Sequence, residues 1–392
     1  VTGHNLVGRE AVIKTLVSDL RGGQHILLPG PRRTGKSSVL LECLATLARQ
    51  GYLTAYVDIA AVNTPRELAL RIVSAVLASN NSKLQKLLQS VTTKLKDLFQ
   101  FKEFKAAYEQ FEVVATLKEP SVDENQFLDQ AFDFLDEFPK KKKKSLIVAF
   151  DEFGEVATID ATIIKKIRAK FQLHKHCTYL FSGSQESVLK EIFSDPNEPF
   201  FGFTKLVTLP PIDPKSFAKY IQSQFLKAFI RVHINQALLI CQVTHTHPFY
   251  AKVFANAVYE QACLSGLKTI DDAVLREGYK RAFTTLKPQM ESLWLELGSR
   301  SRFVRQVCQS LALQNTNVFS QNGLRQLAES AHIAQALKQL ETKGIIQRMG
   351  SGSYQFSNCF LRDFILSLAD VDYFERGLSL AASQMAALPV KS

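Results

Sequence analysis

The sequence has few of the features that mark membrane or secreted proteins. No apolar run approaches the roughly 20 residues that span a bilayer, so we expect no membrane segment and no membrane partner. The six cysteines are scattered without any C-x-x-C pair, which disfavours a zinc site or a disulfide framework and favours reduced thiols. Residues 1–5 do not resemble a signal peptide. We therefore expect a cytoplasmic protein.

Acidic residues are in the minority, with 37 Asp and Glu against 48 Lys and Arg, which gives a formal charge of +11. This excess permits an anionic partner such as nucleic acid. Part of it is local, because residues 140–144 are five consecutive lysines in a predicted helix-to-strand turn. Such a block is usually a solvated turn, and contact with nucleic acid or an acidic partner is the alternative. The length of 392 residues predicts two or three domains.

One stretch, Gly30 to Ser37, fits the pattern G-x-x-x-x-G-K-[ST] of a phosphate-binding P-loop. An apolar run of strand length precedes it at 24–28, and apolar residues at helical spacing follow it at 37–49. In that context successive N–H groups and a helix N-terminus face the phosphates. We expect Lys36 to reach the β- and γ-phosphates and the Ser37 hydroxyl to bind Mg²⁺. The alternative, a chance Gly/Lys turn, is disfavoured by the flanking strand and helix.

A second motif follows the continuous apolar run at 145–150, which is typical of a parallel strand covered on both faces. This run ends in Asp151 and Glu152, and an acidic pair in that place completes a P-loop site. We expect Asp151 to hold Mg²⁺ and Glu152 to orient and polarise the attacking water. A further strand at 178–182 ends near Ser184, which would sense the γ-phosphate, although a simple turn is an equal alternative.

Strands alternate with helices up to residue 209, which predicts an α/β fold with a parallel sheet. After Pro210 the strand signals vanish. Three predicted helices and a glycine-turn hairpin near the C-terminus then indicate a winged helix-turn-helix. The predicted organisation is a P-loop core over 1–209 with a helical excursion at 82–110, a helical lid over 210–298, a winged helix over 299–368 and a C-terminal tail over 369–392, with disorder expected from Ala381.

Taken together, these motifs resemble the archaeal-type ATPases of the STAND branch of P-loop NTPases, relatives of the AAA+ class. The resemblance rests on five features in the same order: residues 7–10, the P-loop through Ser38, the strand ending at 151–153, the strand ending at 182–184, and residues 247–250. It implies an AAA+-like P-loop NTPase fold, ATP or ADP as ligand, and Mg²⁺. It also implies that Gly8 and Arg9 lie near the adenine and ribose, and that the lid closes on the nucleotide.

The candidate site residues follow from the motifs and the resemblance. The nucleotide-binding set is Gly8, Arg9, Gly30, Pro31, Arg32, Arg33, Thr34, Gly35, Lys36, Ser37, Ser38 and Pro248. The catalytic set is Glu152, Lys36 and Ser184, and the metal set is Ser37 and Asp151.

The sequence departs from the resembled family at two positions. Phe203 and Thr204 follow Gly202, where relatives often carry an arginine, and Thr246 lies near the place of a lid glycine. Both departures disfavour fast, self-sufficient hydrolysis and affect binding less. ATP rather than GTP follows from the resemblance, since no guanine-reading motif is evident.

Three functions remain open at this stage. The first is an ATP-dependent molecular switch with slow hydrolysis, which we favour. The second is a DNA-binding initiator or loader ATPase, and the third is a non-catalytic nucleotide-sensing scaffold. We expect an unidentified protein partner, and keep DNA and self-association open. The outward face of the predicted recognition helix is polar but only mildly basic, and it includes Glu341.

Overall fold

A computed structural model describes residues 6–79, 124–313, 330–350 and 352–368. The chain divides into two compact units, Val1–Pro210 and Pro211–Ser392. The sequence also predicts a short strand at 112–117 and a short helix at 320–328, and both lie outside the described residues. The predicted excursion at 82–110 and the C-terminal tail lie outside them as well.

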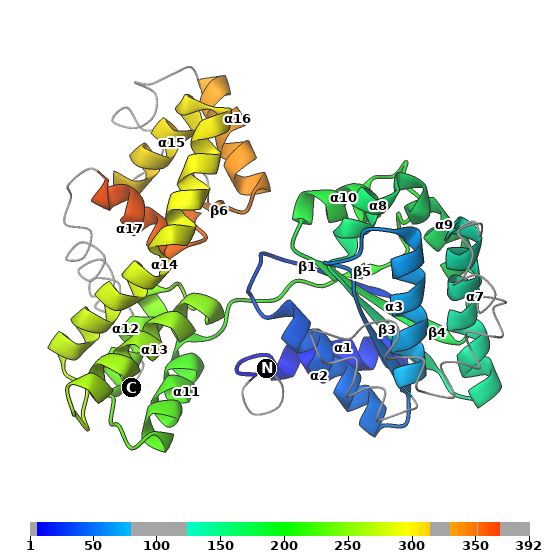
Figure 1. Cartoon of the computed structure of the whole chain (residues 1–392), viewed down its shortest axis with the longest axis horizontal. Helices are drawn as coiled ribbons and strands as arrows, with labels where there is room; N and C mark the ends of the chain where they lie inside the picture. Colours follow the sequence, from blue (N-terminus) through cyan, green and yellow to red (C-terminus); the bar gives the residue numbers. More distant parts are fainter. Residues whose placement is uncertain (1–5, 80–123, 314–329, 351, 369–392) are drawn as a thin grey trace, which may run out of the picture. The chain divides into compact units, whose positions relative to one another are not determined.

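The first unit is built on a five-stranded parallel sheet in the order β2-β3-β4-β1-β5 (Figure 1). The strands are β1 (Ile26–Pro29), β2 (Leu53–Asp58), β3 (Leu146–Asp151), β4 (Cys177–Gly183) and β5 (Lys205–Leu206). The helices are α1 (Glu10–Arg21), α2 (Lys36–Arg49), α3 (Pro65–Ala78), α7 (Glu124–Lys142), α8 (Val156–Ile159), α9 (Ala161–Phe171) and α10 (Glu186–Ser194).

The sheet is buried on both faces, which explains why its central strands are apolar throughout. Every residue of β3 and β4 is buried. Alternate residues of β3 contribute to different cores: Val148 and Phe150 to the core with α3, α7 and α9, and Ile147 and Ala149 to the core with α1 and α2. This two-sided burial is the reason that a parallel strand reads as a continuous apolar run.

Local signals place the helices that follow the strands. Thr64 caps α3, since its hydroxyl accepts the N–H of Glu67 at 3.1 Å and the Glu67 carboxylate accepts the N–H of Asn63 at 2.8 Å. Pro65 occupies the first helical position, where its missing N–H costs little.

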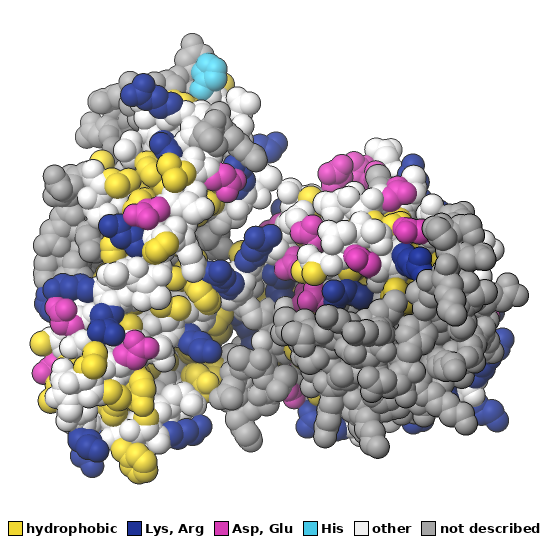
Figure 2. Space-filling view, in the orientation of Figure 1, with side chains coloured by type: hydrophobic (Ala, Val, Ile, Leu, Met, Phe, Trp, Pro, Cys, Tyr) yellow, Lys and Arg dark blue, Asp and Glu magenta, His cyan; other side chains and the backbone are white. Residues whose placement is uncertain are grey.

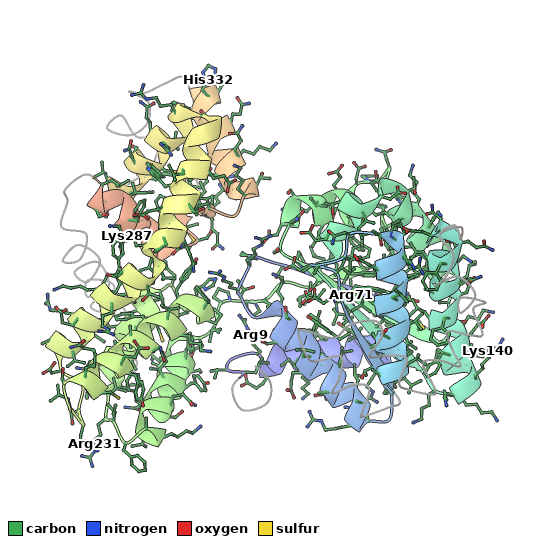
Figure 3. The ribbon with its side chains drawn as sticks, in the orientation of Figure 1. Arg9, Arg71, Lys140, Arg231, Lys287 and His332 are labelled. Atoms are coloured by element: carbon green, nitrogen blue, oxygen red, sulfur yellow. The ribbon has the colours of Figure 1, made fainter. Side chains whose placement is uncertain are left out.

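The five consecutive lysines at 140–144 lie only partly in the predicted helix-to-strand turn. Lys140 to Lys142 belong to the last turn of α7 instead of a turn between elements, and Lys143 then ends the helix with φ 52° (Figure 3). Cations are favourable at a helix C-terminus because the last carbonyls carry partial negative charge. Pro139 lies within this helix and has no N–H for the Leu135 carbonyl, which instead accepts the thiol of Cys177 at 2.8 Å.

The second unit is mainly helical and has one continuous apolar core. Its elements are α11 (Pro214–Lys227), α12 (Ile234–Val243), α13 (Pro248–Leu264), α14 (Asp272–Arg300), α15 (Arg302–Leu313), α16 (Ser330–Thr342), β6 (Ile346–Gly350), β7 (Ser353–Phe356) and α17 (Cys359–Ser367). The predicted hairpin is confirmed as the antiparallel pair β6 and β7. The predicted α/β fold class, a parallel-sheet core followed by a mainly helical part that ends in a hairpin and a helix, is therefore confirmed.

Among the described residues, no helix is both long and apolar enough to cross a membrane.

Candidate functional site

The P-loop connects the end of β1 to the start of α2, and its conformation depends on left-handed residues. Gly35 has φ 95° and Arg33 has φ 65°. Glycine adopts this region freely, whereas a residue with a side chain adopts it at a cost of about 1 kcal/mol or more. A Cβ at Gly35 would meet no atom within 4 Å, so this glycine is required by backbone conformation and not by space.

The start of α2 offers unpaired N–H groups to an anion. Gly35, the residue before the helix, has no side chain that could cap it, and the first turn has no acidic residue. The first N–H groups of a helix lack intrahelical acceptors and carry partial positive charge. These features fit a phosphate group at the N-terminus of α2.

The side chain of Lys36 folds back over this loop and is only 5% exposed. Its ammonium donates to the carbonyls of Gly30 at 2.7 Å and Pro31 at 2.9 Å. Burial lowers the pKa of Lys36, while the carboxylates of Glu152 and Asp151 act in the opposite direction. The ammonium thus lies in the field of both predicted acidic residues.

Strand register brings the separate motifs to one edge of the sheet. Leu28 in β1 pairs with Ser182 in β4, and Phe150 in β3 pairs with Phe181. Because all these strands are parallel, their carboxyl ends carry the P-loop, Asp151 and Ser182 side by side. The N–H of Gly30 also donates to the carbonyl of Gly183 at 3.3 Å, which ties the P-loop to the end of β4.

Asp151 is 3% exposed, and its carboxylate is held by three donors. Oδ2 accepts the hydroxyl of Tyr56 at 2.7 Å. Oδ1 accepts the hydroxyl of Ser182 and the N–H of Glu152, the latter at 3.1 Å. These contacts orient the carboxylate at the carboxyl edge, beside the P-loop. Sequence reasoning missed Tyr56 and included Ser182 only as part of a strand-end motif, and the strand register shows that both reach Asp151.

Glu152 follows Asp151 in a left-handed conformation, with φ 53° and ψ 43°. This conformation is uncommon for glutamate and is typical of strained functional positions. Its Oε2 accepts the N–H of Ser184 at 2.9 Å and the Ser184 hydroxyl at 2.8 Å. Arg32 Nε in turn donates to that hydroxyl at 3.3 Å. The structure thus brings together Arg32, Ser184 and Glu152 in one hydrogen-bonded chain.

Close approach of these two strand ends depends on Gly183. A Cβ there would lie 3.1 Å from a methyl group of Leu189 and 3.7 Å from the Cα of Glu152. The small residue therefore allows Glu152 and Ser184 to meet.

Arg9 also lies against the P-loop and is 5% exposed (Figure 3). Its guanidinium donates to the carbonyl of Thr34 at 3.3 Å and to the carbonyl of Pro210. Gly8 precedes it with φ 67°, and the Thr34 hydroxyl donates to the Pro31 carbonyl at 2.9 Å. Gly8 and Arg9 therefore lie beside the P-loop, and their role toward adenine and ribose remains a prediction.

Pro248 belongs to the second unit, where it opens α13 after His247. Its approach to the nucleotide remains a prediction. The loop before it contains two consecutive left-handed residues, His245 with φ 51° and Thr246 with φ 54°. His245 occupies the position two residues before His247, so a histidine adopts the conformation that glycine adopts most easily.

Another histidine of the second unit, His233, has a structural role: it caps α12 by accepting the N–H of Asn235 at 3.3 Å.

Phe203 lies near the amino ends of the strands, whereas the P-loop lies at their carboxyl ends. Its ring stacks on His25, with centroids 4.4 Å apart, and the Arg168 guanidinium lies 4.6 Å from its ring centroid. His25 directly precedes β1, whereas the P-loop follows β1. An arginine at position 203 would thus lie at the amino edge of the sheet, away from the phosphate site of its own chain.

Comparison with known proteins gives no match to a protein-family model and no match to a curated protein. Solved structures do match over nearly the whole chain. The Walker-type ATPase of Pyrococcus abyssi has a TM-score of 0.66 at 17% identity, covering 92% of this chain and 96% of that one. The ORC2 protein of Aeropyrum pernix in its ADPNP–ADP complexes has a TM-score of 0.61 at 12% identity, covering 98% of each chain. The comparisons therefore show that the chain has the fold of AAA+-type P-loop ATPases.

Proposed function

We propose that the chain binds Mg·ATP at the carboxyl edge of its sheet and hydrolyses it slowly, as a nucleotide-dependent switch. The observation that supports this proposal is that the uncapped start of α2, the ammonium of Lys36 and the Asp151 carboxylate lie at one edge of the sheet, with Ser37 in the first turn of α2. The similar ORC2 structure, described as ADPNP–ADP complexes, supports a nucleotide as the ligand.

Each residue has a role that follows from its position. The α2 N-terminus and Lys36 would bind the phosphates. Ser37 and Asp151 would hold Mg²⁺, and hard oxygen donors of this kind suit that ion. When bound, Mg²⁺ neutralises charge on the phosphate oxygens. Glu152 would accept a hydrogen bond from the attacking water and raise its nucleophilicity.

The tether between Glu152 and Ser184 offers a reason for slow turnover. As long as the carboxylate accepts two hydrogen bonds from Ser184, it is less free to accept one from water. We propose that the Ser184 hydroxyl donates its hydrogen bond to the γ-phosphate of bound ATP instead of to Glu152. The Glu152 carboxylate is then free to accept a hydrogen bond from water. We expect turnover of about one per minute or less, below the ~1–10³ s⁻¹ typical of enzymes.

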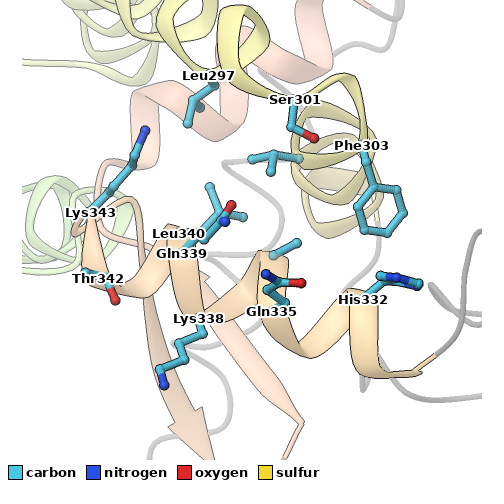
Figure 4. A pocket seen from close by; sticks show the side chains of 12 residues that line it. Leu297, Ser301, Phe303, His332, Gln335, Lys338, Gln339, Leu340, Thr342 and Lys343 are labelled. Carbon is cyan, nitrogen blue, oxygen red and sulfur yellow. The ribbon is translucent and has the colours of Figure 1, made fainter.

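Two other functions follow this one in order of support. A non-catalytic scaffold would bind nucleotide without turnover, and the strained position of Glu152 argues against it. A DNA-binding initiator or loader would use α16, but the exposed polar face of that helix includes Glu341 and is only mildly basic. Gln335 and Gln339 also border a hollow of about 750 Å³ that is lined by Leu297 and Phe303, where a partner's side chains could bind (Figure 4). We therefore place a protein partner ahead of DNA.

The experiment that tests nucleotide binding is calorimetry of Mg·ATP with the full chain and with Lys36→Ala. Loss of the ammonium should weaken binding at least tenfold, because a charge-assisted hydrogen bond is worth about 1.5–3 kcal/mol. Lys14→Ala, an exposed lysine of α1, is the matched control and should bind like the parent. Equal ATP affinity in Lys36→Ala and the parent would contradict the assignment of Lys36.

A further inference from the structure

The hydroxyl of Tyr56 contacts one of the two residues that would hold Mg²⁺ and lies near the other. It donates to Asp151 Oδ2 at 2.7 Å, and the Ser37 side chain lies close enough to affect the pKa of this phenol. Ser37 lies at the start of α2 and Asp151 at the end of β3. The phenol is thus bonded to the acidic strand beside the P-loop helix.

The register of the sheet fixes this position. Tyr56 in β2 pairs with Ala149 in β3, so Asp151 is two residues farther along and projects from the same face. That face packs against α1 and α2, and the ring of Tyr56 contacts the same apolar cluster as Val39 and Leu40. The ring is therefore held by the core, while its hydroxyl reaches the carboxyl edge.

Both oxygens of the Asp151 carboxylate are oriented by hydroxyl groups. Tyr56 donates to Oδ2 at 2.7 Å from β2, and Ser182 donates to Oδ1 from β4.

We infer that Tyr56 is a positioning residue for Mg²⁺, which orients the Asp151 carboxylate beside Ser37 so that both can reach the ion. This inference rests on the proposed function. Hydrogen-bond partners of ligating carboxylates typically change metal affinity by about 10–100-fold when removed. Tyr56→Phe keeps the ring and its packing and removes only the hydroxyl, so the expected effect is on Mg²⁺ and not on the fold.

The test measures ADP binding to the full chain by calorimetry over a Mg²⁺ titration, and in EDTA. We expect Tyr56→Phe to need about 10–100-fold more Mg²⁺ for the half-maximal gain in ADP affinity, with unchanged binding in EDTA. Tyr52→Phe is the matched control, because Tyr52 packs against the same cluster just before β2. It should keep the Mg²⁺ dependence of the parent.

The possible results separate the two proposals. Parent-like Mg²⁺ dependence in Tyr56→Phe would overturn this inference alone. Equal loss of binding with and without Mg²⁺, or a melting temperature far below that of Tyr52→Phe, would show a structural role and also overturn it. A parent chain that binds no ADP under either condition would overturn the proposed function, and this inference with it.

Discussion

At the scale of single residues, Glu152 combines a strained backbone conformation with a proposed role of its carboxylate in activating water. Its left-handed backbone costs about 1 kcal/mol or more, and the residue projects its carboxylate toward Ser184 beside the P-loop. In a solvated loop, glycine or asparagine would adopt this conformation with less strain than glutamate. The conformation persists here because Phe153, the next residue, is fully buried and anchors the turn.

Replacing Glu152 with glutamine separates binding from turnover. Glu152→Gln keeps the shape but loses the negative charge that polarises water, so we expect ATP affinity within about threefold of the parent and turnover lower by about 10²–10⁴-fold. Phosphate release and calorimetry on the same preparation measure the two quantities.

A neighbouring acid provides the control for that experiment. Glu155 accepts a hydrogen bond from Gln185 at 2.6 Å, and Glu155→Gln should retain parental turnover. If Glu152→Gln hydrolyses ATP as fast as the parent, another residue activates the water.

The residues that sequence reasoning found and missed differ in a physical way. Gly30 to Ser37 form a contiguous motif whose geometry is local, so the pattern alone predicts a phosphate loop. Tyr56 and Ser182 reach Asp151 only through the register of strands far apart in the sequence. Apolar periodicity predicts that such strands exist but leaves their register open. The left-handed backbone of Glu152 could not be predicted either, because glutamate has no preference for it.

At the scale of elements, the amino edge of the sheet is held together by His25. Its Nδ1 accepts the N–H of Tyr179 in β4 at 3.2 Å, and its ring stacks on Phe203 just before β5. The imidazole must be neutral at Nδ1 to accept that hydrogen bond. Burial, followed by the charges of Arg168 and His174, lowers the pKa of His25 to about 4.

This shift predicts a pH dependence of stability. Between pH 6.5 and about 4 the unfolded chain binds a proton at His25 and the folded chain does not, so stability is lost as pH falls through this window. From pH 7 to pH 5 we expect the parent to lose about 1–2 kcal/mol more unfolding free energy than His25→Asn, which accepts the same hydrogen bond without titrating.

Urea unfolding at the two pH values measures this difference, and an NMR titration of the His25 ring gives its pKa directly. A ring that titrates near 6.5, or equal acid sensitivity in the parent and His25→Asn, would contradict the packing described for this edge.

The same edge shows why the sequence alone could not locate position 203 relative to the P-loop. The sequence indicates that position 203 lacks an arginine, but only the pairing of β5 with β1 shows that this position is remote from the chain's own P-loop.

At the scale of the whole molecule, the question is what the second unit contacts. On the visible face of this unit, Lys and Arg side chains are interspersed with Asp and Glu (Figure 2). Lys343, the residue that follows α16, already pairs with Glu296 on α14 at 3.7 Å. A DNA-reading helix normally projects Arg, Asn or Gln toward base edges, surrounded by phosphate-binding cations. These features favour a protein contact for the second unit.

We therefore predict that the full chain binds duplex DNA near physiological salt only weakly and without sequence preference, with or without ATP. Binding at low salt should come mainly from Lys140 to Lys142 at the exposed end of α7, because such binding is electrostatic and falls steeply with salt. Replacing Lys140 and Lys141 with alanine should lower the salt slope by about 1 for each phosphate that the protein no longer neutralises. The matched variant on α16, Lys338→Ala with Gln339→Ala, should leave both affinity and slope unchanged.

Fluorescence anisotropy with two unrelated duplexes over a salt series measures both the affinity and the salt slope. Tight, sequence-dependent binding at physiological salt that disappears in the α16 variant would instead establish a DNA-reading helix, and would favour the initiator function over the switch.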